Sequence, residues 1–383
     1  AAGAAARAFA VTRKLPAHKR AEILRKIALG LGDRREELAA LIRDEGGKPI
    51  QFARAEVSRA VDTFNLSADE CSRIDGEVFG LDGAPAGEGR TAIVRRFPRG
   101  PVLAIAPFNF PLNLVAHKVA PAIAAGCPVV VKPAEQTPSA AIVLGEICVA
   151  AGWPAEAISV LPCDRSVAGA LVDDPRFPVI SFTGSDVVGW QLRARAPTKQ
   201  VLLELGGNAS AIVHHDAELA TALPRIALGA YAHAGQVCIS VQNVLIHVSV
   251  LDRAREVLIA AAASVPRGDP SRADTVCGPA TVLLNVPVAT PFGVVGDAGW
   301  TIEPLPVAAR TTVLPGIGLP KPSRAVTVTV AVLLPVDAVI AAGDALTVVC
   351  AALTAPGRVV AMKLTGEPTP LARAVWVLSV GPV

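Results

Sequence analysis

The chain has 383 residues, enough for two or three packed domains, and its 36 basic and 33 acidic residues nearly balance. The resulting net charge of +3 argues against nucleic acid and against anionic membrane surfaces as partners. The seven cysteines are odd in number and none has CxxC spacing. This argues against a disulfide framework and a zinc-cysteine site, and it favours a reducing, cytoplasmic setting.

A metal site is not expected from the histidines. The six histidines contain no HxxxH pair. His214 and His215 are adjacent, and successive side chains of a strand point to opposite faces, so we expect that they do not share an ion. We also expect no signal peptide, because the first residues lack its apolar core.

The N-terminal part of the chain predicts helices. Residues 17–45 carry apolar side chains at helical spacing, which predicts one or two helices. Gly46-Gly47 is expected to end this segment, and Pro49 prevents its continuation. A further helix is predicted from four apolar residues that share one face, namely Val57, Val61, Phe64 and Ala68.

The pattern changes at Arg90, where residues 90–97 alternate and predict strands after a turn at 83–89. Beyond them, short apolar strands alternate with helices. Strands are predicted at 101–106, 129–131, 158–161, 179–182 and 201–204, and helices at 138–152, 166–173 and 185–195. This order predicts parallel βαβ units and therefore an α/β fold with a Rossmann-like, parallel-sheet nucleotide-binding domain.

The last part of the chain differs in composition. Residues 282–383 hold 11 charged residues among 102, against 58 among the preceding 281, and twelve prolines without regular spacing. Residues 325–353 are apolar, so an alternative hypothesis is that the protein is attached to a membrane through this stretch. Pro335, Asp337 and Asp344 interrupt this stretch before it reaches a clean span of about twenty residues.

Two candidate segments directly follow predicted strands. Asn109 lies in a turn bracketed by Pro107 and Pro111, where its amide either donates to a developing oxyanion or simply forms the turn. Lys132 and Glu135 follow the strand at 129–131, where they either hold ribose hydroxyls or form an ordinary surface ion pair.

Three further segments carry candidate chemistry. Gly184-Ser185 joins a strand to a helix and suits phosphate oxygens, although neither GxGxxG nor GxxxxGK[ST] is present. Glu204 lies between apolar neighbours before a Gly-Gly turn, and burial there would raise its pKa and suit it to act as a base. Cys238 is either a small core residue or a nucleophile, and Gly235-Gln236, which interrupts the apolar run just before it, weakens the case for a core residue.

Together these segments resemble motifs of the aldehyde dehydrogenase family. The matching motifs, in order, are PFNFP at 107–111, KPAEQTP at 132–138, FTGS at 182–185, LELGGN at 203–208 and GQVCIS at 235–240. The resemblance covers roughly residues 1–280. The form PFNFPLNL is similar to the branch that includes lactaldehyde and non-phosphorylating glyceraldehyde-3-phosphate dehydrogenases.

The resemblance implies NAD-dependent oxidation of a small aldehyde to a carboxylic acid. Cys238 would attack as a thiolate, giving a thiohemiacetal and then a thioester. The Asn109 amide and the Cys238 backbone N–H would stabilise the oxyanion. Glu204 would activate the hydrolytic water, and Lys118 matches a lysine near the active site.

The same resemblance implies the cofactor contacts. Lys132 and Glu135 match positions that bind the adenosine ribose, and the Glu135 carboxylate would repel a 2′-phosphate, which favours NAD over NADP. Gly184-Ser185 matches the nicotinamide and pyrophosphate neighbourhood, and Pro107-Phe108 is expected to lie beside the cofactor.

The implied organisation is a nucleotide-binding domain at 1–205 with an oligomerisation hairpin at 80–98, the start of an incomplete α/β catalytic domain at 206–289, and a divergent tail at 290–383. Cys163 stands where the family usually has glycine near the cofactor, and Thr290 stands where it has the glutamate that holds the nicotinamide ribose. The tail's composition suggests an out-of-frame or decayed translation of a GC-rich gene.

Two enzyme-class readings follow from these departures. The first is an active aldehyde dehydrogenase that forms a homodimer or homotetramer, with a small aldehyde as substrate and neither nucleic acid nor a membrane as partner. The second is a catalytically impaired homologue that at most binds nucleotide.

Overall fold

The computed structural model describes residues 1–272, 282–285 and 326–333. Contacts divide the chain into two compact units, residues 1–206 with 268–278 and residues 207–267 with 279–383. Within the first unit, the backbone N–H of Ile50 donates to the Pro270 carbonyl at 2.8 Å, which ties the returning segment to the N-terminal helices. Thr290 and most of the tail expected at 290–383 lie outside the described residues.

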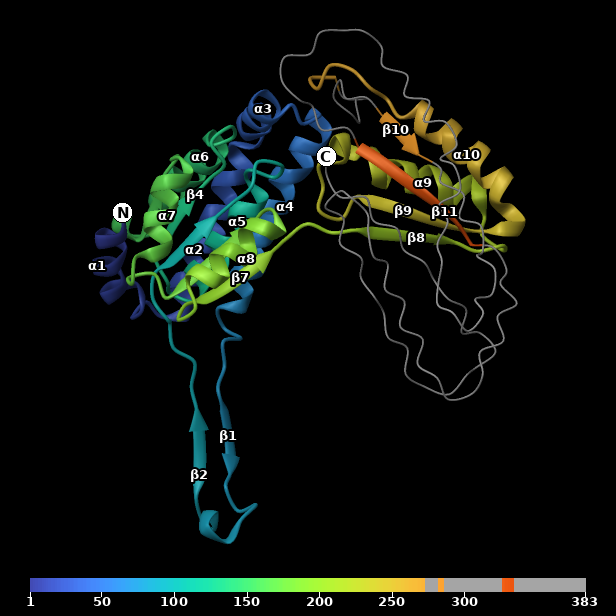
Figure 1. The fold of residues 1–383 in the computed structure, drawn as a ribbon. Coiled ribbons are helices and arrows are strands. Elements are labelled where there is room, and N and C mark those ends of the chain that lie inside the picture. The colour runs from blue at the N-terminus through green and yellow to red at the C-terminus, as the bar shows by residue number, and fades with distance from the viewer. Residues whose placement is uncertain (273–281, 286–325, 334–383) are drawn as a thin grey trace. The chain divides into compact units, whose positions relative to one another are not determined.

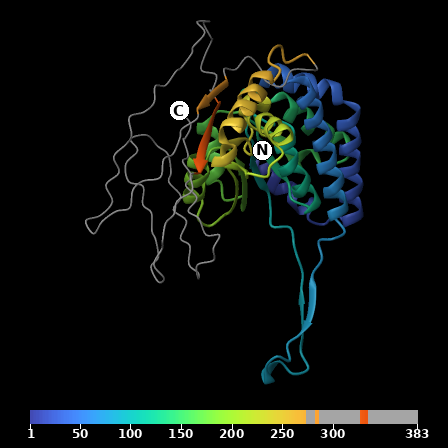
Figure 2. The ribbon, with the colours of Figure 1, turned by 90° about the vertical axis from the view of Figure 1, so that its right-hand side faces the viewer.

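The first unit begins with a layer of helices. These are α1 (Ala2–Thr12), α2 (Ala17–Asp33), α3 (Arg35–Gly46) and α4 (Ile50–Glu70). The helices α2 to α4, blue in Figure 2, run side by side, and the apolar stripe of Leu24, Ile27 and Leu31 on α2 is fully buried. Gly47 ends α3 in a left-handed conformation with φ of 63°, so the predicted helices and their end are confirmed.

A two-stranded hairpin projects from this unit as an arm (Figure 1). Strand β1 (Glu77–Gly80) pairs antiparallel with β2 (Thr91–Val94), and Glu77 lies opposite Val94. The hairpin therefore starts at Glu77, before the predicted start at residue 80. Both strands are largely exposed, including Val78 and Ile93.

The centre of the first unit is a parallel five-stranded sheet in the order β5-β4-β3-β6-β7. Its strands are β3 (Val102–Ile105), β4 (Val129–Lys132), β5 (Ile158–Val160), β6 (Val179–Thr183) and β7 (Gln200–Glu204). The connecting helices are α5 (Asn113–Ala124), α6 (Ser139–Ala150), α7 (Arg165–Asp173) and α8 (Asp186–Arg195). The predicted parallel βαβ architecture is confirmed, and α5 is an additional helix, most of which is buried.

Side chains of the central strands alternate between two cores. On β3, Val102 and Ala104 join the large core under α2 to α6, whereas Leu103 joins a smaller core with residues of α1, α7 and β6. On β4, Val129 and Val131 join the large core, whereas Val130 joins the smaller one. Both faces of these two central strands are thus covered, as is usual in a parallel sheet.

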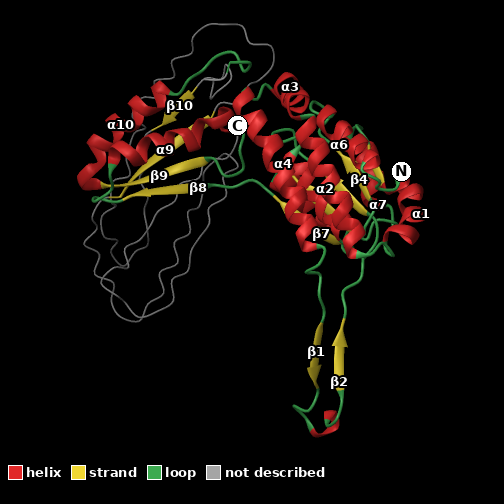
Figure 3. Cartoon of the chain, turned by 180° about the vertical axis from the view of Figure 1, so that it is seen from behind, coloured by secondary structure: helices red, strands yellow, loops and turns green. Residues whose placement is uncertain are grey.

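The second unit is a smaller α/β layer. Its parallel sheet has the order β10-β11-β9-β8. The strands are β8 (Ala209–Val213), β9 (Val241–His247), β10 (Val282–Asn285) and β11 (Val326–Leu333), and the helices α9 (Leu219–Tyr231) and α10 (Leu251–Ser264) lie side by side against β9 (Figure 3).

The apolar stretch at 325–353 falls mainly outside the described residues. Its part Val326–Leu333 forms strand β11, which pairs with β9 and β10. Among the helices that the structure describes, each is too short or too polar to cross a bilayer.

Candidate active site

The carboxyl ends of the first unit's strands bring most of the candidate residues to one edge of the sheet. Because β3, β4, β6 and β7 are parallel, the segments that follow them emerge on the same side. The strand order reverses direction between β3 and β6, and ligands of open α/β sheets bind at such a switch point. Asn109 follows β3 there, and Gly184-Ser185 follows β6.

The loop that carries Asn109 is held by a buried ion pair. The Oε1 atom of Glu56 accepts the backbone N–H groups of Leu112 and Asn113 at 2.9 and 3.0 Å, where α5 begins. Its Oε2 atom accepts the ammonium of Lys48, which also lies 3.6 Å from the centre of the Phe110 ring. Asn109, half-buried with Pro107 and Phe108, therefore lies in a loop with a fixed end.

Lys48 and Glu56 were missed by the sequence analysis. Their side chains are 1% and 0% exposed. Burial lowers the pKa of Lys48, and the charge of Glu56 opposes this effect. The available signal was the position of Glu56 within the apolar stripe that Ala53, Val57 and Ala60 form on α4, since a carboxylate in such a stripe needs a partner.

Lys118 reaches from α5 to strand β6. Its ammonium donates to the hydroxyls of Ser181 at 3.0 Å and Thr183 at 2.8 Å. Burial lowers the pKa of Lys118 to about 8, and the charge of Glu204 partly opposes this shift. Lys118 and Glu204 are thus close enough for their charges to interact, although no hydrogen bond joins them among the described contacts.

Glu204 is exposed, so the burial expected for its carboxylate is wrong. It is the last residue of β7 and lies opposite Thr183 of β6 in the strand register. Its carbonyl accepts the backbone N–H of Gly184 at 3.1 Å. Glu204 shares the exposed face of β7 with Gln200 and Leu202, because exposure alternates along this strand.

The segment after β4 contains the predicted ribose contacts. The Lys132 ammonium lies 3.4 Å from Glu135, and the two side chains are 10% and 54% exposed. The Thr137 hydroxyl donates to the Phe108 carbonyl at 3.5 Å, which connects this segment with the Asn109 loop. A carboxylate presented to solvent beside a buried ammonium suits the hydroxyls of a ribose.

Cys163 follows β5 at the same edge and is half-buried. Burial raises the pKa of its thiol, while the charge of Lys132 opposes the shift. The next residue, Asp164, accepts the backbone N–H groups of Ser166 and Val167 and thus caps α7. Cys163 consequently has a fixed backbone beside Lys132.

Gly184-Ser185 forms the entry to α8. The Ser185 hydroxyl accepts the Val188 backbone N–H at 3.4 Å, as an N-cap does. A side chain at Gly184 would place its Cβ 2.6 Å from the Phe182 ring, so any larger residue there would force the ring to move. The free N–H groups of a helix start are suited to phosphate oxygens.

Cys238 belongs to the second unit, so contacts within one unit do not bring it together with Asn109, Glu204 or Lys118. It lies exposed in a turn between the short helix Ala232–Gly235 and β9. His233 and Ala234 in that short helix have φ of 52° and 55°. Non-glycine residues adopt this left-handed conformation only at a cost, and such strain is concentrated at functional sites.

Contacts within the second unit fix the Cys238 turn. The buried Ser240 hydroxyl donates to the Ala230 carbonyl at 3.0 Å. A side chain at Gly207 would place its Cβ 2.8 Å from the Cys238 carbonyl oxygen, so glycine permits this close approach. Asn243 on β9 donates to the Asn208 side chain at 2.7 Å, which joins the end of the LELGGN segment to the strand that follows the Cys238 turn.

A histidine cluster in the same unit corrects the sequence analysis. His214 and His215 were expected on opposite faces of a strand, but β8 ends at Val213 and both lie in the following turn. Their ring centroids are 4.2 Å apart. The alternation argument is therefore wrong at this position, because it holds only inside a strand.

The chain is similar to known proteins over its first part. The profile described as "Aldehyde dehydrogenase family" matches residues 1–282. A 3-sulfolactaldehyde dehydrogenase of Priestia aryabhattai is 44% identical over 234 residues, which cover 61% of this chain and 49% of the relative. The chain thus spans about half the length of this curated relative.

Solved structures show the same similarity. Aldehyde dehydrogenase 21 from Physcomitrella patens, in complex with the reaction product succinate, is 42% identical with a TM-score of 0.70, over 73% of this chain and 58% of that one. Glyceraldehyde-3-phosphate dehydrogenase GapN from Methanocaldococcus jannaschii, complexed with NADP, is 37% identical with a TM-score of 0.69, over 73% and 61%.

Proposed function

The chain belongs to the aldehyde dehydrogenase family, and from this premise we propose that it oxidises an aldehyde to a carboxylic acid with a nicotinamide nucleotide. The observation that carries the proposal is the exposure of the Cys238 side chain. Of the cysteines that the structure describes, Cys71, Cys127 and Cys148 are buried and Cys163 is half-buried, whereas Cys238 is exposed in a turn that follows strained backbone. A thiol must be accessible to act as a nucleophile.

The proposed roles of the protein groups follow from their chemistry. Cys238 attacks the aldehyde carbon as a thiolate and forms a thiohemiacetal. The Asn109 amide and the Cys238 backbone N–H donate to its oxyanion. Glu204, at the exposed end of β7, removes a proton from the water that hydrolyses the thioester. Lys118, with its pKa lowered to about 8, contributes a positive charge close to Glu204.

The residues at the carboxyl edge of the first unit's sheet suit the binding of a nicotinamide nucleotide. When bound, a nicotinamide nucleotide supplies the acceptor for the two electrons that leave the aldehyde. Lys132 and Glu135 would hold the adenosine ribose, Gly184-Ser185 the phosphate oxygens, and Pro107-Phe108 would lie beside the ring system. The fit rests on the strand-order switch between β3 and β6 and on the exposed Glu135 carboxylate beside buried Lys132.

We propose NAD as the preferred nucleotide, although similar solved structures include complexes with NADP. The Glu135 carboxylate repels a 2′-phosphate, and at 54% exposure it is free to face the ribose. The ratio of kcat/KM for NAD over NADP measures the preference. We expect Glu135→Gln to lower this ratio, and an unchanged ratio would remove Glu135 from the explanation.

The hairpin of β1 and β2 is proposed as the surface through which copies of the chain associate into a dimer or tetramer. Its two strands expose four large apolar side chains, Val78, Phe79, Ile93 and Val94, and Leu81 and Phe97 beside the strands are exposed as well. Such an exposed apolar arm gains stability when a second copy covers it. Light scattering of Ile93→Asp tests this, because a charge in the covered surface should lower the molecular mass in solution.

The experiment that tests the function is the formation of reduced nicotinamide with a panel of small aldehydes, run with Cys238→Ala in parallel. Turnover that disappears in the variant supports the proposed mechanism. If the soluble chain binds nucleotide but does not turn over, the second candidate applies, a catalytically impaired homologue that at most binds nucleotide. The absence of the expected glutamate, with Thr290 at its place, motivates this second candidate.

A further inference from the structure

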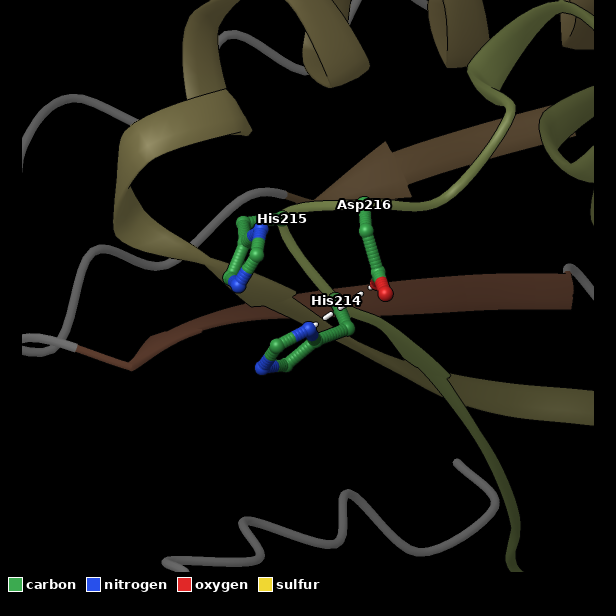
Figure 4. Close-up of side chains that lie close together, drawn as sticks. All are labelled: His214, His215 and Asp216. Carbon is green, nitrogen blue, oxygen red and sulfur yellow. Dashed lines mark hydrogen bonds and ion pairs between the residues drawn. The ribbon is translucent and has the colours of Figure 1, made fainter.

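Three of the chain's six histidines gather in the second unit, away from the cysteine turn. His214, His215 and Asp216 follow the end of β8, and His247 ends the neighbouring strand β9. Val213 lies opposite Ile246 in the parallel register, so the two strands deliver these residues to the same edge. Figure 4 shows that His214, His215 and Asp216 come from one short turn.

The donor atoms of this turn are close enough to share one ion. One ligand atom from each of His214, His215 and Asp216 lies within 4.8 Å of the other two. The His214 Nδ1 atom is 3.0 Å from a carboxylate oxygen of Asp216. Ligands of one zinc ion lie about 2.1 Å from the metal and hence roughly 3.4 Å from each other. All three residues are exposed, so their side chains have room to rotate toward a shared ion.

We propose that His214, His215 and Asp216 bind one divalent transition-metal ion, such as Zn²⁺ or Ni²⁺. Two imidazoles with one carboxylate are a donor set that these borderline ions prefer, whereas Ca²⁺ and Mg²⁺ prefer oxygen donors alone. The ion takes the place of the proton between His214 and Asp216. Water completes the coordination, because the site is open to solvent.

His247 is left outside the ligand set. Its ring centroid is 5.4 Å from those of both His214 and His215. However, its Nδ1 atom is occupied by Ser249, with the backbone nitrogen at 3.2 Å and the hydroxyl at 2.8 Å. This contact caps the turn Val248–Val250, so His247 would have to reorganise before it could bind a metal.

The proposed metal site is separate from the Cys238 turn. Gly207 and Cys238 meet just before β8 and β9 begin, whereas the histidines lie where these strands end. With five and seven residues in the two strands, the separation is roughly 20 Å at about 3.3 Å per residue. The ion therefore fastens the turn between β8 and α9 and does not take part in the thiol chemistry.

The test measures ion binding to the untagged full chain by equilibrium dialysis against Zn²⁺, with Co²⁺ absorption spectra to identify the ligands. We expect one ion per chain and a Co²⁺ spectrum without thiolate charge-transfer bands. Loss of an outer-shell partner costs 10–100-fold in metal affinity, so His215→Ala and Asp216→Ala, which remove ligands, should each cost at least about 100-fold. His18→Ala, which removes an exposed histidine of the first unit, is the matched control and should leave binding unchanged.

Two results would overturn the proposal. The first is that no ion binds, or that the Co²⁺ spectrum shows only thiolate ligands, which would come from cysteine. The second is that the ion still binds with unchanged affinity in His214→Ala and in His215→Ala, each tested singly. Circular dichroism of each variant separates loss of a ligand from loss of fold, and because the three side chains are exposed, the variants should remain folded.

Discussion

The buried pair of Lys48 and Glu56 allows a sharp test of what holds the Asn109 loop. In Glu56→Gln, the Oε1 acceptor of the Leu112 and Asn113 backbone N–H groups is kept. The amide nitrogen replaces Oε2, the atom that accepts the Lys48 ammonium in the wild type, and therefore faces this ammonium without being able to accept its hydrogen bond. The substitution thus removes the ion pair at nearly constant shape and leaves a buried cation without an anion.

The expected loss is large. Breaking a buried ion pair by removing one partner costs about 3–5 kcal/mol, because the remaining charge stays desolvated. For a unit of this size, 1 kcal/mol corresponds to about 2–4 °C, so the melting temperature should fall on the order of 10 °C. Urea unfolding followed by circular dichroism measures the free energy, and hydrogen exchange of the α5 amides shows whether the loss begins at that helix.

Two controls make this prediction refutable. Lys48→Met with Glu56→Gln removes both charges, so the double variant should be more stable than the sum of the single losses predicts. Glu70→Gln breaks the exposed pair with Arg73 and should leave stability unchanged. If Glu56→Gln unfolds like the wild type, or if the double variant shows simple additivity, the ion pair does not hold the loop.

Three further predictions concern single residues. Burial lowers the pKa of Lys118 from 10.5 to about 8, so between these pH values the unfolded state binds more protons than the folded state. The free energy of unfolding should therefore rise with pH across this window, by about 3 kcal/mol in total. Urea titrations at several pH values should show this rise for the wild type and a smaller one for Lys118→Met, and equal slopes would contradict the role of Lys118. Gly207→Ala pushes on the Cys238 carbonyl and should lower turnover by roughly ten- to a hundred-fold, whereas Gly206→Ala, with open space around its Cβ, should remain near the wild type. Cys163 stands where the family usually has glycine, so its side chain should crowd the nucleotide. Cys163→Gly should therefore tighten nucleotide binding, measured by titration calorimetry, and unchanged or weaker binding would contradict this reasoning.

The periodicity of the sequence predicted most elements of the first unit, because helices and strands there bury regular faces. The apolar run at 101–106 became β3, and the predicted end of the helical segment became the left-handed Gly47 after α3. Helix α5 was not predicted, since it contains Pro121, which normally interrupts a helix, and its buried residues include the polar Asn113 and Lys118. The hairpin starts at Glu77, three residues before the bound at residue 80 that the family resemblance implied.

The candidate residues themselves were readable from short motifs, since each chemistry needs particular side chains in a fixed local order. The sequence alone determined that Asn109, Glu204 and Cys238 stand in such motifs and that the fold is α/β. Only the tertiary structure decided that Glu204 is exposed, that Lys118 reaches Ser181 and Thr183, and that Glu56 holds the loop of Asn109. It also gathered the histidines after β8 and β9. The physical reason is that burial and charge pairing depend on neighbours far away in the chain, and local sequence spacing does not specify those neighbours.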